Sequence, residues 1–485
     1  MRPPNRRTFV LSTAALAGCA LAPEQSTSSD TALRALADDE TAAPAVRWRA
    51  LQRVDARTLT TEGRILRAAI APGTEAEAAL AQFPFGAGGA PYAVTHRNGA
   101  YRNANATPAA INAETARLRA DAAMGVVAPA FVLDATIPLV EAAAARATGE
   151  RAAALRSQLA ALRDLRRDAA EATGVWRLPN GAAFYTHALA LQLGAPIDPH
   201  GAHQRARAEC AKFQAEADQI LRTHGHRRGE FAARLAALLR DPAQHYAESD
   251  VGRGAALADM RITLERARAL CASAFTNAPP AAEVRALPLS EEAHGTRGRR
   301  EGGAYIVDLG GGRARWTLPS VVYHETLPGH LLQAQYELAA PALQRRYAGG
   351  YSEGWATYAE MLADALGGHD GAHPLSRLGY LHWMLFRMAR IVIDTGMHAL
   401  RWSHTRAIAE MRALQGESIA FVSIEEDVSR IVAQPGVAAA QGLAALHIAD
   451  ARARTRLPLP AFHDAILRRG PMSPAGLDEA LRLTR

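Results

Sequence analysis

Hydrophobic residues recur every three or four positions through most of the chain, which is the period of an amphipathic helix. The pattern is clearest in the segments 112–127, 150–173 and 204–224. Turn-forming sequences, such as Arg-Leu-Pro-Asn-Gly at 177–181, separate the helical segments. Further helices are expected at 319–339, 351–366, 375–395, 403–414 and 424–433. The chain is therefore predicted to be mostly α, with a large multi-helix body.

The segment 276–315 has a different pattern, because it is rich in glycine, proline and charged residues. It contains two short runs typical of strands, at 283–287 and 304–309. We expect a small β-sheet here, next to the helix that follows. No convincing linker interrupts the chain between residues 37 and 485, so this part is predicted to form a single domain.

Composition and charge exclude some classes of protein. The chain has 485 residues, of which 49% are hydrophobic and 21% are charged, and these values are normal for a folded protein. The net charge is +7, but the arginines are scattered among acidic residues. Nucleic-acid binding would need a basic stripe, so we expect no nucleic-acid partner. Cys210 and Cys271 could form a disulfide or remain free thiols, and they lack the CxxC spacing of metal ligands.

The amino-terminal segment resembles an export signal. Arg6 and Arg7 precede an apolar run of about ten residues, as in a twin-arginine signal peptide. The sequence Leu-Ala-Gly-Cys ending at Cys19 resembles the lipobox of bacterial lipoproteins, although simple cleavage that discards Cys19 is the alternative. We expect a signal peptide at 1–18 and a polar tether at 19–36. The protein is then exported to the periplasm or cell envelope, and a lipid on Cys19 is its only expected membrane contact.

The sequence Val-Val-Tyr-His-Glu-Thr-Leu-Pro-Gly-His-Leu-Leu-Gln at 321–333 resembles the zinc-binding motif HExxH with two extra residues. His330 follows His324 by six positions, and in an unbroken helix this spacing places the two side chains about 240° apart. Pro328 and Gly329 are well suited to a bulge, because proline has no N–H to leave unpaired and glycine tolerates unusual backbone angles. A bulge there would let both histidines bind one zinc ion.

A catalytic zinc needs a third protein ligand and an open position for water. Glu353 lies 23 residues after His330 and is the expected third ligand. Glu360, seven residues further along the same helix, would support a ligating histidine, although these two roles could be exchanged. Glu325 is the expected general base that takes a proton from the zinc-bound water. The alternative is a chance His-Glu pair on an ordinary helix.

These motifs resemble those of the DUF885 family, which contains large helical bacterial proteins that are often lipoproteins related to gluzincin-type zinc peptidases. The first motif is matched by His324, Glu325, Thr326, Pro328, Gly329, His330 and Gln333. The second is matched by Tyr351, Glu353, Gly354, Trp355, Tyr358 and Glu360. The third is matched by Arg387, Arg390, Asp394, Gly396, His398 and Trp402. The chain departs from the family pattern at Leu331, Ile431, Val437 and Gln441, although Arg430, Pro435 and Gly436 are retained.

Other polar residues are candidates for binding the substrate. His398 or Tyr351 could donate a hydrogen bond to the oxyanion that forms during hydrolysis, but either could equally be packed in the core. Arg387 and Arg390 could bind a substrate carboxylate, or they could be structural. His369 lies in loop-like sequence and is expected to be exposed.

Together these features predict a zinc-dependent metallopeptidase with one zinc ion and a peptide substrate. The alternatives are a zinc hydrolase that acts on small amides or esters, and a non-catalytic lipoprotein that contains a metal. The identity of the substrate, the choice between endo- and exo-cleavage, and the oligomeric state stay open.

Overall fold

The computed structural model describes residues 25–292, 298–310, 313–371, 373–419 and 422–484. The predicted signal peptide and Cys19 lie outside the described residues. Within this part of the chain, no single helix is long and apolar enough to span a membrane; only the bent pair of helices α17 (Ile424–Ala433) and α18 (Val437–Arg454) meets those criteria together.

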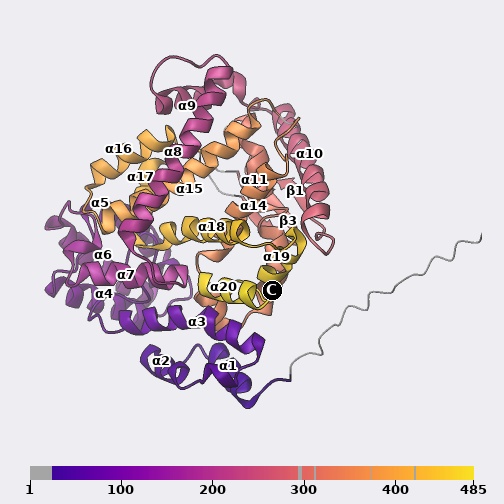
Figure 1. Ribbon diagram of the computed structural model, residues 1–485. Helices are drawn as coiled ribbons and strands as arrows, with labels where there is room; N and C mark the ends of the chain where they lie inside the picture. Colours follow the sequence, from indigo (N-terminus) through magenta and orange to yellow (C-terminus); the bar gives the residue numbers. More distant parts are fainter. Residues whose placement is uncertain (1–24, 293–297, 311–312, 372, 420–421, 485) are drawn as a thin grey trace, which may run out of the picture.

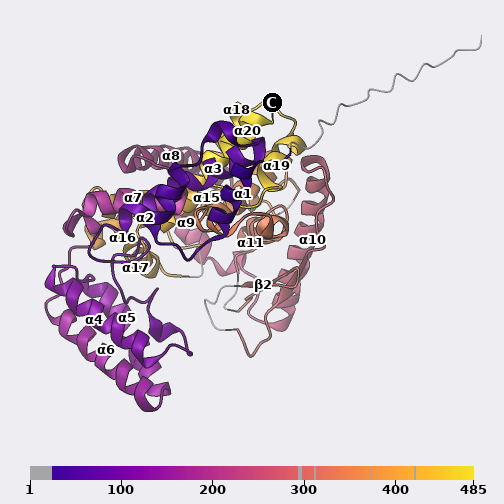
Figure 2. The same cartoon turned by 90° about the horizontal axis from the view of Figure 1, so that it is seen from below.

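Helices make up the first half of the chain. They are α1 (Ser28–Asp38), α2 (Pro44–Gln52), α3 (Thr61–Leu80), α4 (Pro108–Ala123), α5 (Ala130–Arg146), α6 (Gly149–Arg167), α7 (Gly181–Leu193), α8 (Pro199–Thr223), α9 (Phe231–Arg240) and α10 (Asp250–Ala274). Figure 2 shows α4, α5 and α6 grouped on one side of the molecule, with α10 on the opposite side. Cys210 on α8 and Cys271 on α10 are both buried and free, so the free-thiol alternative holds.

Helix α1 occupies part of the segment that was predicted to be a polar tether, so that prediction is wrong from residue 28 onward. Thr27 caps the helix by accepting a hydrogen bond from the Asp30 N–H, and the Asp30 side chain bonds back to the Thr27 backbone. Leu33 and Ala37 are fully buried, and α1 packs against α3. The apolar residues therefore outweigh the polar composition of this segment.

A three-stranded sheet precedes the motif helix, as the two predicted strand runs indicated. Strands β1 (Glu283–Ala286) and β3 (Ala304–Val307) pair in parallel, and β2 (Arg299–Glu301) pairs antiparallel with β3. The strand order is β1-β3-β2. Strand β2 was not predicted, because its three residues, Arg-Arg-Glu, are all exposed and show no apolar alternation.

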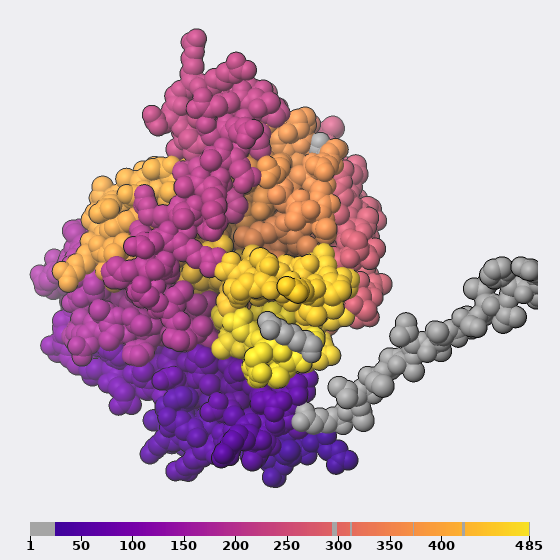
Figure 3. All heavy atoms as spheres, in the orientation of Figure 1, coloured from indigo at the N-terminus to yellow at the C-terminus, as the bar shows by residue number. Residues whose placement is uncertain are grey.

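The second half of the chain is again helical. It contains α11 (Leu318–Glu325), α12 (His330–Gln333), α13 (Ala342–Arg346), α14 (Tyr351–Ala365), α15 (Ser376–His398), α16 (His404–Gln415), α17 (Ile424–Ala433), α18 (Val437–Arg454), α19 (Leu459–Leu467) and α20 (Pro474–Leu483). Helix α15 is almost entirely buried and packs against α8, α16 and α18 in the middle of the molecule (Figure 1). The last helices return to the start of the chain, where α20 packs on α3, and Figure 3 shows these yellow and indigo surfaces side by side.

Candidate metal centre

The helix that carries the first motif is interrupted at the position that the spacing of its histidines predicts. Helix α11 ends at Glu325, and Thr326 leaves the helical conformation with φ −113° and ψ −103°. The peptide bond between Leu327 and Pro328 is cis, and α12 begins at His330. The predicted helix at 319–339 is therefore divided by a short loop of residues 326–329, which we call the Pro-Gly loop.

The Pro-Gly loop lies close to α11 and is hydrogen-bonded to α14. At Gly329 an added Cβ would lie 1.9 Å from the His324 carbonyl oxygen and 2.4 Å from the Tyr323 carbonyl oxygen, so this position requires glycine. The indole N–H of Trp355 on α14 donates a hydrogen bond of 2.9 Å to the Pro328 carbonyl. The loop is thus fixed both to the end of α11 and to the helix that carries the second motif.

The loop brings the two histidine rings together. Their centroids are 4.8 Å apart, and the rings are nearly perpendicular. Both histidines are buried. Glu353 on α14 faces them, with its carboxylate oxygens 3.4 Å from Nε2 of His324 and 3.6 Å from Nε2 of His330. One ligand atom from each of these three residues lies within 4.8 Å of the others.

The chemistry of this cluster fits a zinc ion. Nε2 of His330 is buried and has no hydrogen-bond partner among the described residues, whereas Nδ1 lies 3.2 Å from the Ser352 hydroxyl oxygen. A buried polar atom without a partner is costly, so a ligand at this atom would remove that cost. Two imidazole nitrogens and one carboxylate form a common set of protein ligands for catalytic zinc.

Glu360 lies behind His324, in the position expected for a supporting residue. Its Oε1 is 2.9 Å from Nδ1 of His324, and its other carboxylate oxygen accepts a hydrogen bond from the Ser320 hydroxyl. Arg387 on α15 donates to the same Oε1 at 2.9 Å. Glu360 is completely buried and contacts Nδ1, while Glu353 faces the Nε2 atoms of both histidines. This geometry favours Glu353 as the ligand and Glu360 as the support.

The electrostatics of the cluster favour a positive charge between the two carboxylates. Burial raises the pKa of Glu353, but its ion pairs with His324 and His330 outweigh this effect and hold the pKa well below its usual value. Burial and Arg387 lower the pKa of His324, yet its bonds to Glu353 and Glu360 raise it to about 9. Burial lowers the pKa of His330.

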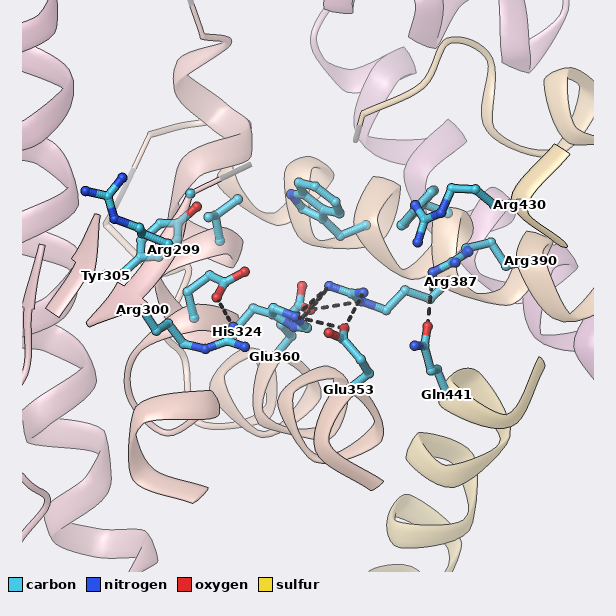
Figure 4. Close-up of a pocket in the computed structure, with 15 residues that line it drawn as sticks. Arg299, Arg300, Tyr305, His324, Glu353, Glu360, Arg387, Arg390, Arg430 and Gln441 are labelled. Carbon is cyan, nitrogen blue, oxygen red and sulfur yellow. Dashed lines mark hydrogen bonds and ion pairs between the residues drawn. The ribbon is translucent and has the colours of Figure 1, made fainter. Parts of the chain in front are cut away.

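A pocket of about 430 Å³ opens beside the cluster. It is lined by Gly298, Arg299, Arg300, Tyr305, Val321, His324, Glu325, Glu353, Glu360, Trp383, Phe386, Arg387, Arg390, Arg430 and Gln441 (Figure 4). The Glu325 carboxylate is partly exposed in this pocket and pairs with the Arg300 guanidinium from β2. The predicted general base therefore shares one pocket with two of the predicted metal ligands, His324 and Glu353.

The sequence comparisons identify the family of this chain. A family model described as a bacterial protein of unknown function, DUF885, matches residues 20–481. The chain belongs to the DUF885 family. None of the curated proteins matches it.

Two solved structures share the fold of this DUF885 protein. One is a lipoprotein candidate from Colwellia psychrerythraea, with 23% identity and a TM-score of 0.78 over 95% of this chain and 92% of that one. The other is a lipoprotein candidate of unknown function from Shewanella oneidensis, with 17% identity and a TM-score of 0.65 over 94% of this chain and 97% of that one.

His398 and Tyr351 are placed away from the pocket of this DUF885 protein. His398 is fully buried; Nδ1 accepts a hydrogen bond from the Val175 N–H at 3.2 Å, and Nε2 lies 3.1 Å from the Ile431 carbonyl oxygen. The Tyr351 hydroxyl donates to the Ile466 carbonyl at 3.0 Å. Neither is among the described residues that line the pocket. The geometry thus favours the packed alternative over hydrogen bonding to an oxyanion.

The prediction that His369 is exposed is wrong. Its side chain is buried, and Nδ1 lies 2.7 Å from the Ser376 hydroxyl oxygen. The surrounding glycines suggested an open loop, but tertiary packing covers the ring.

The two predicted arginines do line the pocket. Arg387 on α15 lies beside the metal cluster, with Nη1 3.9 Å from a Glu353 oxygen. Arg390 donates to the Gln441 side-chain oxygen at 3.1 Å, and its Nε lies 3.2 Å from Asp427. Sequence reasoning missed the pocket residues from the sheet, which are Arg299, Arg300 and Tyr305. The sequence of β3 is typical of a strand, but nothing in the sequence indicated that this sheet would line the pocket or that Arg300 on β2 would pair with Glu325.

Proposed function

We propose that this chain is a zinc-dependent metallopeptidase. The observation that carries the proposal is the convergence of His324, His330 and Glu353 on one point, with the Nε2 atom of His330 buried and without a hydrogen-bond partner among the described residues. A purely structural cluster has no need of a pocket beside it, but here the pocket is lined by His324, Glu353 and Glu325 together.

Each residue of the cluster then has a distinct role. When bound, zinc lowers the pKa of a water molecule and polarises a substrate carbonyl. Glu325 takes the proton from the attacking water and passes it to the leaving amine. Arg300 holds the Glu325 carboxylate at the pocket wall, because the two side chains form an ion pair. Glu360 fixes the orientation of the His324 ring so that Nε2 faces Glu353.

The proposed location is the bacterial cell envelope, with a lipid on Cys19 as the anchor. Two observations support it: the lipobox-like sequence before Cys19, and the description of both structural neighbours as lipoprotein candidates. The envelope location places the active site where exported peptides are available as substrates.

The proposed function is tested by separating metal binding from proton transfer. Glu325→Gln keeps the shape of the side chain but loses the basic oxygen, so the variant should bind zinc like the wild type. Its rate of peptide hydrolysis should fall by about 10²–10⁴-fold, the usual contribution of general acid-base catalysis. Glu353→Gln should lose zinc and activity together, because it removes a charged ligand.

Zinc content and hydrolysis rate are measured on both variants, with Glu265→Gln as the control. Glu265 is 73% exposed on α10, so its substitution should change neither quantity. Full activity in Glu325→Gln would refute the catalytic role and favour a non-catalytic lipoprotein that contains a metal. Loss of zinc from Glu325→Gln would refute the division of roles between Glu325 and Glu353.

A further inference from the structure

The pocket beside the metal cluster is lined by arginines at both ends. Five of its lining residues are arginines. In Figure 4, Arg299 and Arg300 lie at one end, Arg390 and Arg430 lie at the other, and the metal cluster lies between them. The lining carboxylates are Glu325, Glu353 and Glu360, which belong to the catalytic and metal-binding set. A bound zinc ion would add further positive charge, so the pocket favours an anionic substrate.

The two ends differ in their exposure to solvent. The side chains of Arg299 and Arg300 are 47% and 40% exposed, and they pair with Glu291 and Glu325 respectively. Arg390 and Arg430 are only 11% and 12% exposed. The sheet end is therefore the open mouth of the pocket, and the α15 end is its closed end.

The closed end has the donors that a carboxylate needs. Asp427 lies between the two arginines, 3.2 Å from Nε of Arg390 and 3.6 Å from Nη1 of Arg430, so one buried carboxylate faces two guanidinium groups. The side-chain oxygen of Gln441 accepts a hydrogen bond from Arg390, and its amide nitrogen is a donor. Guanidinium groups bind carboxylates through paired hydrogen bonds, and these are strong where water is excluded.

We propose that Arg390, Arg430 and Gln441 bind the C-terminal carboxylate of a peptide, so that the enzyme removes residues from the C-terminus of its substrate. This inference rests on the proposed function, since it assigns the substrate of the same pocket. The upstream part of the peptide leaves through the mouth beside Arg299 and Arg300. A free amino terminus at the closed end would meet two guanidinium groups, and the Asp427 carboxylate between them is buried and paired with both, so trimming from the N-terminus is disfavoured.

The spacing along α15 sets the size of the product. Arg387 lies beside the metal ligand Glu353, and Arg390 follows three residues later, a rise of about 4.5 Å along the helix. One residue of an extended peptide spans about 3.3–3.6 Å. The carboxylate site is thus one or two peptide residues from the scissile carbonyl, and the expected product is a single amino acid or a dipeptide.

The first experiment compares two peptides that differ only at the C-terminus. A hexapeptide with a free carboxylate and the same hexapeptide with a C-terminal amide are titrated calorimetrically into zinc-loaded Glu325→Gln protein, which binds without turnover. The free acid should bind at least about tenfold more tightly, because the amide lacks the charge that the arginines recognise. A third peptide, amidated but ending in glutamate, separates a C-terminal carboxylate from a side-chain carboxylate.

Equal binding of the acid and the amide would overturn the proposal, and so would equally tight binding of the amidated glutamate peptide. Arg390→Lys in the same background should lose most of the preference for the acid, because lysine cannot form the paired hydrogen bonds. Arg285→Gln, an exposed residue of β1 outside the pocket, should retain it. The comparison of the two peptides uses the intact pocket, so it stays decisive even if the Arg390 variant fails to fold.

The products of the wild-type enzyme separate this inference from the proposed function. Mass spectrometry of the free acid peptide should show loss of one or two C-terminal residues. Hydrolysis at internal bonds, at equal rates in acid and amide, would overturn C-terminal trimming but leave a zinc peptidase. Tighter binding of the acid without any hydrolysis would refute the peptidase and retain the carboxylate site.

Discussion

The close approach of the Pro-Gly loop to α11 predicts that Gly329→Ala damages the metal site. The new methyl group would lie 1.9 Å from the His324 carbonyl oxygen and 2.4 Å from that of Tyr323. Both atoms belong to the backbone of α11, so no side chain can rotate away to make room. The loop must separate from the helix that carries His324.

The size of the effect follows from these distances. An ordinary contact of this kind is about 3.4 Å, so the loop and the helix must move apart by roughly 1.5 Å. Metal-ligand distances tolerate deviations of only about 0.2 Å, so one histidine would leave the ion. We expect zinc affinity to fall by about 100-fold or more, given that supporting residues alone contribute 10–100-fold. Overpacking should also cost about 1–3 kcal/mol in the free energy of unfolding.

Zinc affinity is measured by competition with a chelator of known affinity, and stability by denaturant unfolding of the metal-free protein. Gly254→Ala is the matched control, because Gly254 lies in α10 with no atom within 4 Å of the added Cβ. That substitution should leave zinc binding unchanged and stabilise the helix by about 0.5–1 kcal/mol. Wild-type affinity and stability in Gly329→Ala would refute the argument that the loop positions His330.

Two further predictions concern stability and location. His382 is fully buried, and burial lowers its pKa to about 4 from an ordinary value of 6.5. Between these pH values the unfolded chain binds a proton that the folded chain excludes, so the free energy of unfolding should fall as pH drops, by up to about 3 kcal/mol from this residue. The free energy of unfolding, measured with denaturant from pH 7 to pH 4, should fall less in His382→Gln than in the wild type. An equal fall in the two proteins would contradict this assignment. Cys19→Ser should move the protein from the membrane fraction to the soluble exported fraction, and a wild-type protein that is already wholly soluble would contradict the lipid anchor.

The sequence was most informative where the signal is local. Helical periodicity predicted α14 at 351–366 and α17 at 424–433, close to the observed bounds Tyr351–Ala365 and Ile424–Ala433. The six-residue spacing of the motif histidines predicted a break in the helix, because the geometry of a helix and the properties of proline and glycine are local.

The sequence was less informative where tertiary packing decides. Arg300 reaches Glu325 only because the fold brings β2 near the end of α11, and its charged strand has no apolar pattern that would reveal it. A histidine in a helix looks the same in sequence whether it lines a pocket or, like His398, fills the core. The burial of Leu33 in α1 likewise depends on neighbours that are remote in sequence.

The most direct test of the metal centre is anomalous diffraction at the zinc edge from crystals of protein incubated with zinc. The proposal predicts one peak, about 2.0–2.1 Å from Nε2 of both His324 and His330 and about 2.0–2.2 Å from a Glu353 oxygen. A fully loaded crystal with no peak at these three residues, or with a peak that Glu353 does not contact, would contradict it.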